Sequence, residues 1–274
     1  MNRIFVLEKL KEFLNEDIGY QDLTTEGIYR GERAKAVVKA KEEGVLAGVL
    51  FVKELFDLLG DVEIKPIKKE GETFSRGEII LEIEGDAKSI LMGERVALNL
   101  LQRLSGIATT TRRFVEKLEP KGIKILDTRK TTPGFRFFEK YAVRVGGGTN
   151  HRFALYDMVL IKDNHKKVAG GLSEAVKRVR EKISPVYKIE VEVENLGELE
   201  EALGLGVDIV MLDNFSPEQV KEAVKLIKGR CLVEVSGNIT LENLEDYAIE
   251  GVNFISSGSI IHSSRWIDLS LKIL

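Results

Sequence analysis

The stretch that decides the fold is 208-DIVMLDNFSPEQVKEAVKLIKGRCLVEVSG-237. Two short apolar runs, one at each end, are separated by an amphipathic helical pattern that begins at Pro217. Short apolar runs that alternate with helical patterns are typical of parallel strands joined by helices. Each run also ends in small or polar residues, Asp213-Asn214 and Ser236-Gly237. The stretch therefore predicts one βαβ unit whose strands point polar groups toward the same edge of a sheet.

The same unit recurs through the second half of the chain. Further apolar runs are 123-IKILDT, 158-MVLIKDN, 188-KIEVEVEN and 253-NFISSG, and the helical patterns between them are 173-SEAVKRVREKI, 196-LGELEEALGLG and 241-LENLEDYAIEG. A barrel or a doubly wound sheet fits this rhythm. The polar strand ends favour the barrel, because they would surround one mouth there and form a row in an open sheet. About six strands, fewer than the eight of a closed barrel, predict an incomplete (open) α/β barrel.

The first hundred residues follow a different, mixed rhythm. Helical patterns at 4–15, 50–60 and 89–106 alternate with strand-like segments around 34–49 and 62–85, which predicts an α+β layer with helices on one face of a sheet. We therefore expect two domains, residues 1–104 and the barrel at 105–265. The C-terminal residues 266–274 are expected to form a helix that packs back on the first domain.

Composition excludes several classes of function. The chain has 274 residues, 41 Lys+Arg against 44 Asp+Glu, and 7% aromatic residues, which argues against a nucleic-acid surface. No run reaches the roughly 18 apolar residues that span a membrane, and the N-terminus is interrupted by charges, unlike a signal peptide. One cysteine excludes an intramolecular disulfide framework. The expected location is the cytoplasm, with no membrane or nucleic-acid partner.

The charge balance reverses locally between Asp127 and Lys167. Nine Lys/Arg face four acids there, although the whole chain has a net charge of −3. Such a patch suggests an anion site. Four cations at or beside predicted strand ends should face the mouth, namely Arg129, Lys130, Arg152 and Lys162. The other five are expected to pair with surface acids: Arg136, Lys140, Arg144, Lys166 and Lys167.

Acids and small-residue loops complete the predicted mouth. Glu190, Glu192 and Glu194 alternate along one strand and should share a face. Glu192 and Asp213 could hold sugar hydroxyls, bind Mg²⁺, balance positive charge or simply pair with the cations. The segments 146-GGGTNHR, 236-SGN and 256-SSGS suit close backbone approach to a phosphate, and no Walker pattern occurs. This set suits transfer of a phosphorylated sugar to an anionic acceptor.

The central motif, 127-DTRKTTPGFRFFEKYAVRVGGGTNHR-152 followed by 155-LYDMVLIKDNH, closely resembles the quinolinate phosphoribosyltransferase family. The similarity extends from 16-EDIGYQDLTT through 94-ERVALNLLQRLSGIAT to 257-SGSIIHS. It implies an N-terminal open sandwich, an incomplete α/β barrel and a homodimer in which the sandwich of one subunit covers the other's mouth. The implied reaction makes nicotinate mononucleotide, CO₂ and pyrophosphate from quinolinate and phosphoribosyl pyrophosphate, with Mg²⁺, in de novo NAD synthesis.

The resemblance also implies roles for individual residues. Arg95 matches an arginine that reaches the partner's site, and Lys130 matches a lysine near the pyrophosphate. Arg129, His151, Arg152 and Lys162 match the grip on the two carboxylates of quinolinate. Glu192 and Asp213 match the acids at the ribose and Mg²⁺, and together with Lys162 they are the expected catalytic residues.

The remaining expected substrate contacts come from short loops: Thr128, Ser236, Gly237, Asn238, Ser257, Gly258 and Ser259. Family members commonly have a second glycine where this chain has Asn238, so its part in the phosphate loop is open. His262 lies in a matching SxxHS context without an assigned role.

Three alternatives remain from the residues. The acceptor could be nicotinate or another acid, although the full cationic set favours a dicarboxylate. A catalytically dead relative could bind a pyridine acid as a sensor. A Schiff-base aldolase with Lys162 as the amine is a third possibility, which the polar neighbours Asp163 and Asn164 disfavour.

Overall fold

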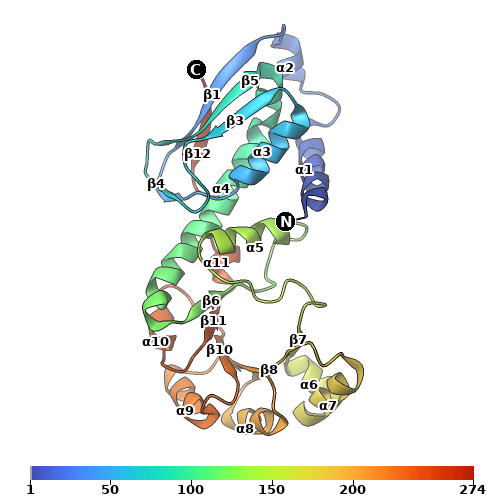
Figure 1. Ribbon diagram of the computed structural model, residues 1–274, viewed down its shortest axis with the longest axis vertical. Coiled ribbons are helices and arrows are strands. Elements are labelled where there is room, and N and C mark those ends of the chain that lie inside the picture. The colour runs from blue at the N-terminus through green and yellow to red at the C-terminus, as the bar shows by residue number, and fades with distance from the viewer. Residues whose placement is uncertain (1) are drawn as a thin grey trace. The chain divides into compact units, whose positions relative to one another are not determined.

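A computed structural model describes residues 2–274. The chain divides into two compact units, and Figure 1 follows it through both. The first unit takes the residues up to Thr110 together with 137–147 and 264–274, and the second takes 111–136 and 148–263. The expected boundary between residues 104 and 105 placed 137–147 in the barrel, but this segment belongs to the first unit.

The first unit combines helices with antiparallel strands. Its elements are α1 (Arg3–Ile18), α2 (Leu23–Ile28), β1 (Arg33–Ala40), β2 (Gly44–Val45), α3 (Val49–Leu59), β3 (Val62–Pro66), β4 (Thr73–Phe74), β5 (Ile79–Asp86), most of α4 (Ala87–Leu118), α5 (Arg136–Val145) and β12 (Leu269–Ile273). Four strands form one sheet in the order β12-β1-β5-β3, and β2 pairs with β4. The fold is therefore the α+β open sandwich that the sequence predicts.

Local sequence explains the main helices of this unit. The Asn2 side chain accepts a hydrogen bond from the Phe5 N–H and caps α1, whose residues Val6, Leu10 and Leu14 recur every fourth position and are buried. On α4, a Cβ at Gly93 would lie 2.6 Å from the Phe56 ring of α3. The absence of a side chain at Gly93 lets the two helices approach closely.

The C-terminal segment is a strand, so the helix expected at 266–274 is wrong. β12 pairs antiparallel with β1, from Ala36 opposite Ile273 to Ala40 opposite Leu269. The segment 269-LSLKI alternates apolar and polar residues, which is the period of a strand. Pairing with β1 satisfies backbone groups that would otherwise form an open sheet edge.

The helix α5 belongs to the first unit because of its aromatic and charged contacts. The Phe51 ring of α3 lies 4.8 Å from the rings of both Phe138 and Tyr141, measured between centroids. Arg103 of α4 donates to the buried carboxylate of Glu139 at 2.6 Å. Lys140 is buried too, so the expectation that it lies on the surface is wrong.

The second unit repeats βα connections. Its elements are the end of α4, η1 (Glu119–Lys121), β6 (Lys124–Leu126), β7 (Val159–Ile161), α6 (Asp163–Ala169), α7 (Leu172–Lys182), β8 (Ile189–Val193), α8 (Leu196–Leu205), β9 (Ile209–Asp213), α9 (Pro217–Ile227), β10 (Leu232–Ser236), α10 (Leu244–Tyr247), β11 (Phe254–Ser256) and α11 (Ser259–His262). Six strands form a parallel sheet in the order β6-β11-β10-β9-β8-β7. No pairing joins β6 to β7 within residues 2–274, so the predicted open barrel is confirmed.

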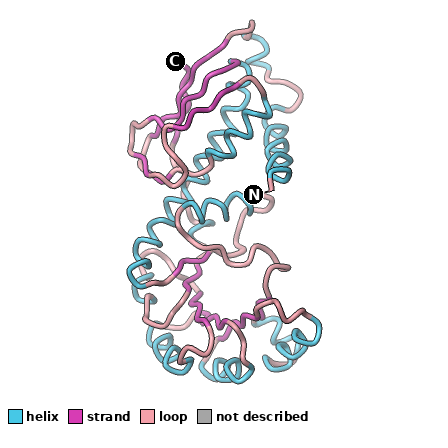
Figure 2. The backbone as a smooth tube through the Cα atoms, viewed as in Figure 1, coloured by secondary structure: helices cyan, strands magenta, loops and turns pink. Residues whose placement is uncertain are grey.

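The register of this sheet decides which side chains enter the barrel. Figure 2 shows the strands curving with α7, α8 and α9 outside the curve. Glu192 lies opposite Met211, and Met211 lies opposite Glu234, so these three residues form one inward row. The alternate residues, such as Val191 and Leu212, are fully buried. The pleat thus separates an apolar, helix-facing side from a polar interior.

Candidate active site

A cavity of about 850 Å³ opens at the carboxyl ends of the barrel strands. It is lined by nearly all the residues expected there: Thr128, Arg129, Lys130, His151, Arg152, Lys162, Glu192, Asp213, Ser236, Gly237, Asn238, Ser257, Gly258 and Ser259. His151 and Arg152 come from the segment that precedes β7, and the others lie at or just after the carboxyl ends of six different strands, which only a curved sheet brings together.

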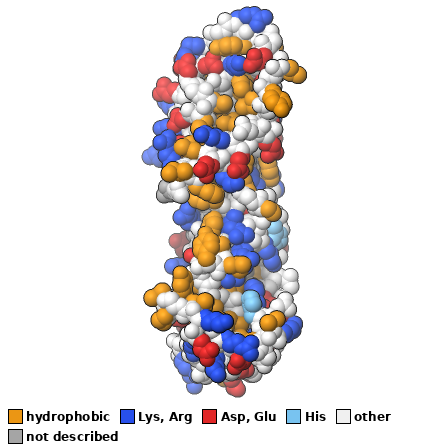
Figure 3. Space-filling view, turned by 90° about the vertical axis from the view of Figure 1, so that its right-hand side faces the viewer, with side chains coloured by type: hydrophobic (Ala, Val, Ile, Leu, Met, Phe, Trp, Pro, Cys, Tyr) orange, Lys and Arg blue, Asp and Glu red, His pale blue; other side chains and the backbone are white. Residues whose placement is uncertain are grey.

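One wall of the cavity is cationic. The Arg152 side chain is largely buried and donates to the Met158 carbonyl at 3.1 Å. Burial lowers the pKa of the Arg152 guanidinium, and the nearby positive charge of Arg129 lowers that pKa further. Figure 3 shows Lys and Arg side chains beside a histidine on one outer face of the second unit. Like charges held at such a wall favour a ligand with more than one negative charge.

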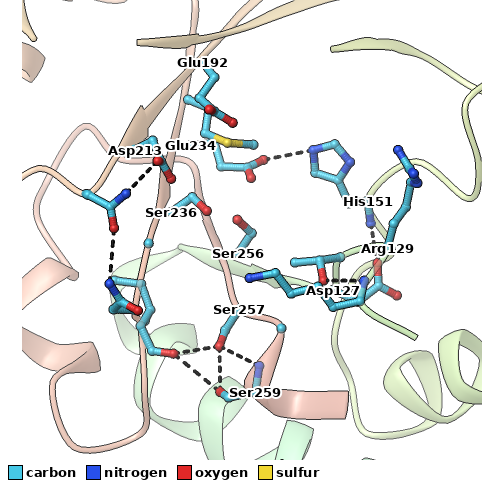
Figure 4. A pocket seen from close by; sticks show the side chains of 18 of the residues that line it. Asp127, Arg129, His151, Glu192, Asp213, Glu234, Ser236, Ser256, Ser257 and Ser259 are labelled. Carbon is cyan, nitrogen blue, oxygen red and sulfur yellow. Dashed lines mark hydrogen bonds and ion pairs between the residues drawn. The ribbon is translucent and has the colours of Figure 1, made fainter. Parts of the chain in front are cut away.

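His151 reaches from this wall into the barrel interior. Its Nε2 lies 2.9 Å from Glu190 Oε2 and 3.4 Å from Glu234 Oε2, and Figure 4 shows the ring pointing toward Glu234. Burial lowers the pKa of His151, but the two carboxylates outweigh burial and raise it to about 10. The Arg152 main-chain N–H donates to Nδ1 at 2.7 Å, so Nδ1 acts as an acceptor. This hydrogen bond favours the ring with a single proton on Nε2, against the doubly protonated ring that the raised pKa favours.

The opposite wall carries the acids. Lys162 Nζ, from the end of β7, lies 2.7 Å from Glu192 Oε2. Burial raises the pKa of Asp213, and the charge of Glu192 raises it further against the effect of Lys162. Lys166 is buried and pairs with Glu198 while it donates to the Glu192 carbonyl, so it supports the end of β8 and is not the surface charge expected.

Two small-residue loops close the third side. Gly237 has φ +104°, and a Cβ there would lie 2.3 Å from Asn214 Oδ1. At Gly258 a Cβ would lie 2.9 Å from the His262 ring and from Lys130 Cδ. The Ser257 hydroxyl donates to the Ile239 carbonyl at 2.7 Å and lies 2.6 Å from the Ser259 hydroxyl, so the loops hold each other. Backbone N–H groups in such loops can bind phosphate oxygens.

Comparison with known proteins covers almost the whole chain. Residues 22–105 match the quinolinate phosphoribosyl transferase N-terminal domain, and residues 107–272 match the C-terminal domain of the same family. A probable nicotinate-nucleotide pyrophosphorylase [carboxylating] of Bacillus subtilis is 46% identical, with 100% of this chain and 95% of the relative covered. A protein of the same description from Methanocaldococcus jannaschii is 45% identical over 100% of this chain and 99% of the relative.

The chain belongs to the quinolinate phosphoribosyltransferase family. The crystal structure of NadC from Streptococcus pyogenes matches with a TM-score of 0.95 and 43% identity, covering 100% of this chain and 99% of that one. The nicotinate-nucleotide pyrophosphorylase from Francisella tularensis matches with a TM-score of 0.95 and 40% identity, covering 100% and 98%. Both domains of this family member therefore have the family fold.

Arg95 is the one expected site residue outside the cavity. It is exposed on α4, in the first unit of the chain. The expectation that Glu190, Glu192 and Glu194 share a face is right for the first two, but Glu194 follows the end of β8 and is exposed.

Sequence reasoning missed several residues that line the cavity, above all Glu234, which sits inside the apolar run at 231–235. Its inward position could have been found from its alternation with Ser236. Among residues 2–274, no helix has the length and apolar character needed to cross a bilayer.

Proposed function

We propose that this family member transfers the phosphoribosyl group of phosphoribosyl pyrophosphate to quinolinate with loss of CO₂, giving nicotinate mononucleotide and pyrophosphate for NAD biosynthesis. The observation that carries the proposal is the gathering of a cationic wall, two acids and two small-residue loops around one cavity. The wall, the acids and the loops each suit a different chemical group of the two substrates.

The cationic wall suits the dianion quinolinate. Arg129 and Arg152 repel each other across the wall, so a carboxylate between them relieves that repulsion. A second carboxylate would draw on Lys162, whose ammonium lies beside Glu192 and can exchange partners at the mouth. Nicotinate has one carboxylate and would leave part of this wall without a counter-charge.

The acids and loops suit phosphoribosyl pyrophosphate. The loops at Gly237 and Gly258 would bind the 5′-phosphate, and Lys130 would face the pyrophosphate. Glu192 and Asp213 fit a Mg²⁺ ion, because burial and the charge of Glu192 both raise the pKa of Asp213 and a bound cation would offset both effects. Mg²⁺ bound there would neutralise charge on the departing pyrophosphate.

The reaction then needs few groups from the protein. The pyridine nitrogen of quinolinate attacks the anomeric carbon as the bond to pyrophosphate breaks, and pyrophosphate keeps the electron pair. Glu192 and Asp213 would stabilise positive charge at the sugar. In the pyridinium product the bond to the neighbouring carboxylate breaks, CO₂ leaves, and a proton takes its place on the ring carbon.

We further propose a cytoplasmic homodimer in which Arg95 enters the partner's cavity. Arg95 lies on α4 with its neighbours Leu91 and Asn99 also exposed, four residues apart along one face of the helix. Tyr20 and Leu23 add exposed apolar surface to the first unit. An arginine supplied from another subunit would complete the grip and exclude water from the activated sugar.

A paired assay tests the reaction. Purified protein with phosphoribosyl pyrophosphate and Mg²⁺ receives quinolinate in one tube and nicotinate in the other, and nicotinate mononucleotide and CO₂ are measured. Product and CO₂ from quinolinate alone are expected. Product from nicotinate alone would identify nicotinate as the acceptor in place of quinolinate. Tight quinolinate binding without product would favour a protein that senses quinolinate.

A matched pair of variants assigns the result to the cationic wall. Arg152→Gln should lower kcat/KM for quinolinate by about 100-fold, the loss typical of a buried charged contact. Arg178→Gln removes the same charge from an exposed helix pair with Glu174 and should stay within about twofold of wild type. Equal effects of the two variants would contradict the dicarboxylate grip.

A further inference from the structure

The proposed chemistry does not use two carboxylates, one that lines the cavity and one that lies behind it on the His151 ring. Glu190 of β8 and Glu234 of β10 are 0% and 1% exposed. One oxygen of each, Oε1, has no hydrogen-bond partner among the described residues 2–274. Burying two carboxylates side by side is costly unless something offsets their charge. Their retention inside the barrel therefore needs a reason.

His151 supplies the offsetting contact. Its Nε2 donates toward both carboxylates, and the three groups offer ligand atoms within 4.8 Å of one another. The opposite side of the ring is fixed as well, because the Arg152 N–H donates to Nδ1. The imidazole is thus held at both nitrogens, and its orientation depends on the two buried acids.

His151 connects the two segments that carry Arg129 and Arg152 of the cationic wall. The main-chain N–H of His151 donates to the buried Asp127 carboxylate at 2.9 Å, and Asp127 directly precedes Thr128 and Arg129. On the other side His151 is followed by Arg152. A movement of the imidazole would therefore disturb the backbone that presents both arginines to the cavity.

We propose that Glu190 and Glu234 are positioning residues, which hold His151 by its Nε2 and so fix Arg129 and Arg152 for the two carboxylates of the substrate. The inference rests on the proposed function only in naming quinolinate as the ligand. A histidine between two acids could also bind a metal ion. The Arg152 main-chain N–H donates to Nδ1, which leaves Nε2 as the protonated nitrogen beside Glu190, whereas a metal would require Nε2 to lose its proton.

The direct test measures the ¹⁵N chemical shifts of the His151 imidazole. The chain has three histidines, so ¹⁵N-histidine labelling gives few signals, and His151→Asn identifies that of His151. We expect the His151 nitrogen shifts of the wild-type protein to move clearly in Glu190→Gln and in Glu234→Gln, without any substrate present. Glu222→Gln, an exposed change of the same charge on α9, should leave them unchanged.

Quinolinate binding gives the functional readout. Calorimetry should show Kd for quinolinate raised about tenfold in each Gln variant, because a displaced His151 weakens the contacts of Arg129 and Arg152 with the substrate. In steady-state kinetics KM should rise by a larger factor than kcat falls. In a His151→Asn background the same Glu changes should add less than about twofold, since their effect passes through the imidazole. Glu190→Asp and Glu234→Asp, which keep the charge and shorten the reach, should weaken binding in the same direction.

Several outcomes would overturn the proposal. Unmoved His151 shifts, or losses that add fully to that of His151→Asn, would leave the two acids with a purely structural role. One equivalent of metal in the purified protein, lost in either Gln variant, would show that His151, Glu190 and Glu234 bind a metal ion and that no proton on Nε2 joins them. If the wild type does not bind quinolinate, the proposed function fails, but the nitrogen shifts still decide whether the acids hold the ring.

Discussion

Single residues in the two small-residue loops show how backbone geometry shapes this site. Gly237 has φ +104°, and no space exists for a Cβ beside Asn214. Asn238 follows with φ +52°, a conformation that asparagine tolerates better than most residues. Its side chain donates to Asn214 Oδ1 at 3.3 Å, and Asn214 in turn donates to Asp213. The loop is thereby linked to one of the acids.

Gly237→Ala should damage phosphoribosyl pyrophosphate binding. The added methyl group would displace Asn214, so we expect KM for this substrate to rise about tenfold or more and the unfolding free energy to fall by roughly 1–3 kcal/mol. Gly229→Ala is the control, because Gly229 also has positive φ, +73°, but open space around it. Steady-state kinetics and thermal unfolding check both variants; a fully active Gly237→Ala enzyme would contradict the close approach at this loop.

Asn238→Gly should be nearly silent. Glycine accepts the left-handed backbone, and the lost hydrogen bond to Asn214 is partly exposed, so kcat/KM is expected to stay within about twofold of wild type. The measurement is the same assay at saturating quinolinate. A tenfold loss would mean that the Asn238 side chain contacts the substrate and belongs to the phosphate site.

At the scale of elements, the strand at the C-terminus depends on a pairing that lies far away in sequence. β12 extends the first sheet along β1, and Leu269 is 3% exposed there. The barrel strands behave differently, because each strand and its helix are neighbours in the chain. Their inward and outward faces follow directly from the two-residue period.

Deleting residues 269–274 should destabilise the first unit. The loss of Leu269 burial alone predicts a fall in unfolding free energy of at least about 2 kcal/mol, and β1 would gain an open edge that promotes aggregation. Chemical denaturation followed by circular dichroism measures the change. Deleting Leu274 alone, which is 79% exposed, is the matched control. Equal stability of the two truncated proteins would argue against a structural role for β12.

At the scale of the whole molecule, the proposed dimer divides each active site between two chains. Arg95→Ala and Lys162→Ala should each be almost inactive as pure proteins. When they are unfolded and refolded together, half of the dimers should be mixed, and one of the two sites in each would be intact. About a quarter of wild-type activity should return. Mixing without recovery, in dimers proven to be mixed, would place Arg95 in its own subunit's site or outside any site.

The sequence by itself determined the fold class, because apolar periods of two and of about 3.6 residues are local properties. It also determined most of the cavity, since residues at the carboxyl ends of barrel strands must meet at one mouth. Thr128, Asp213 and Ser257 needed no coordinates to be placed there. The local excess of positive charge between Asp127 and Lys167 identified Arg129 and Arg152 as candidate anion-binding residues.

Only the tertiary structure decided the pairings between distant residues. The contact of His151 with Glu190 and Glu234 joins three segments, and nothing in the apolar run around Glu234 signals it. The strand β12 and the membership of α5 in the first unit depend in the same way on partners remote in the chain. Local patterns specify what each segment can form, and the complementary surface elsewhere in the chain selects what it does form.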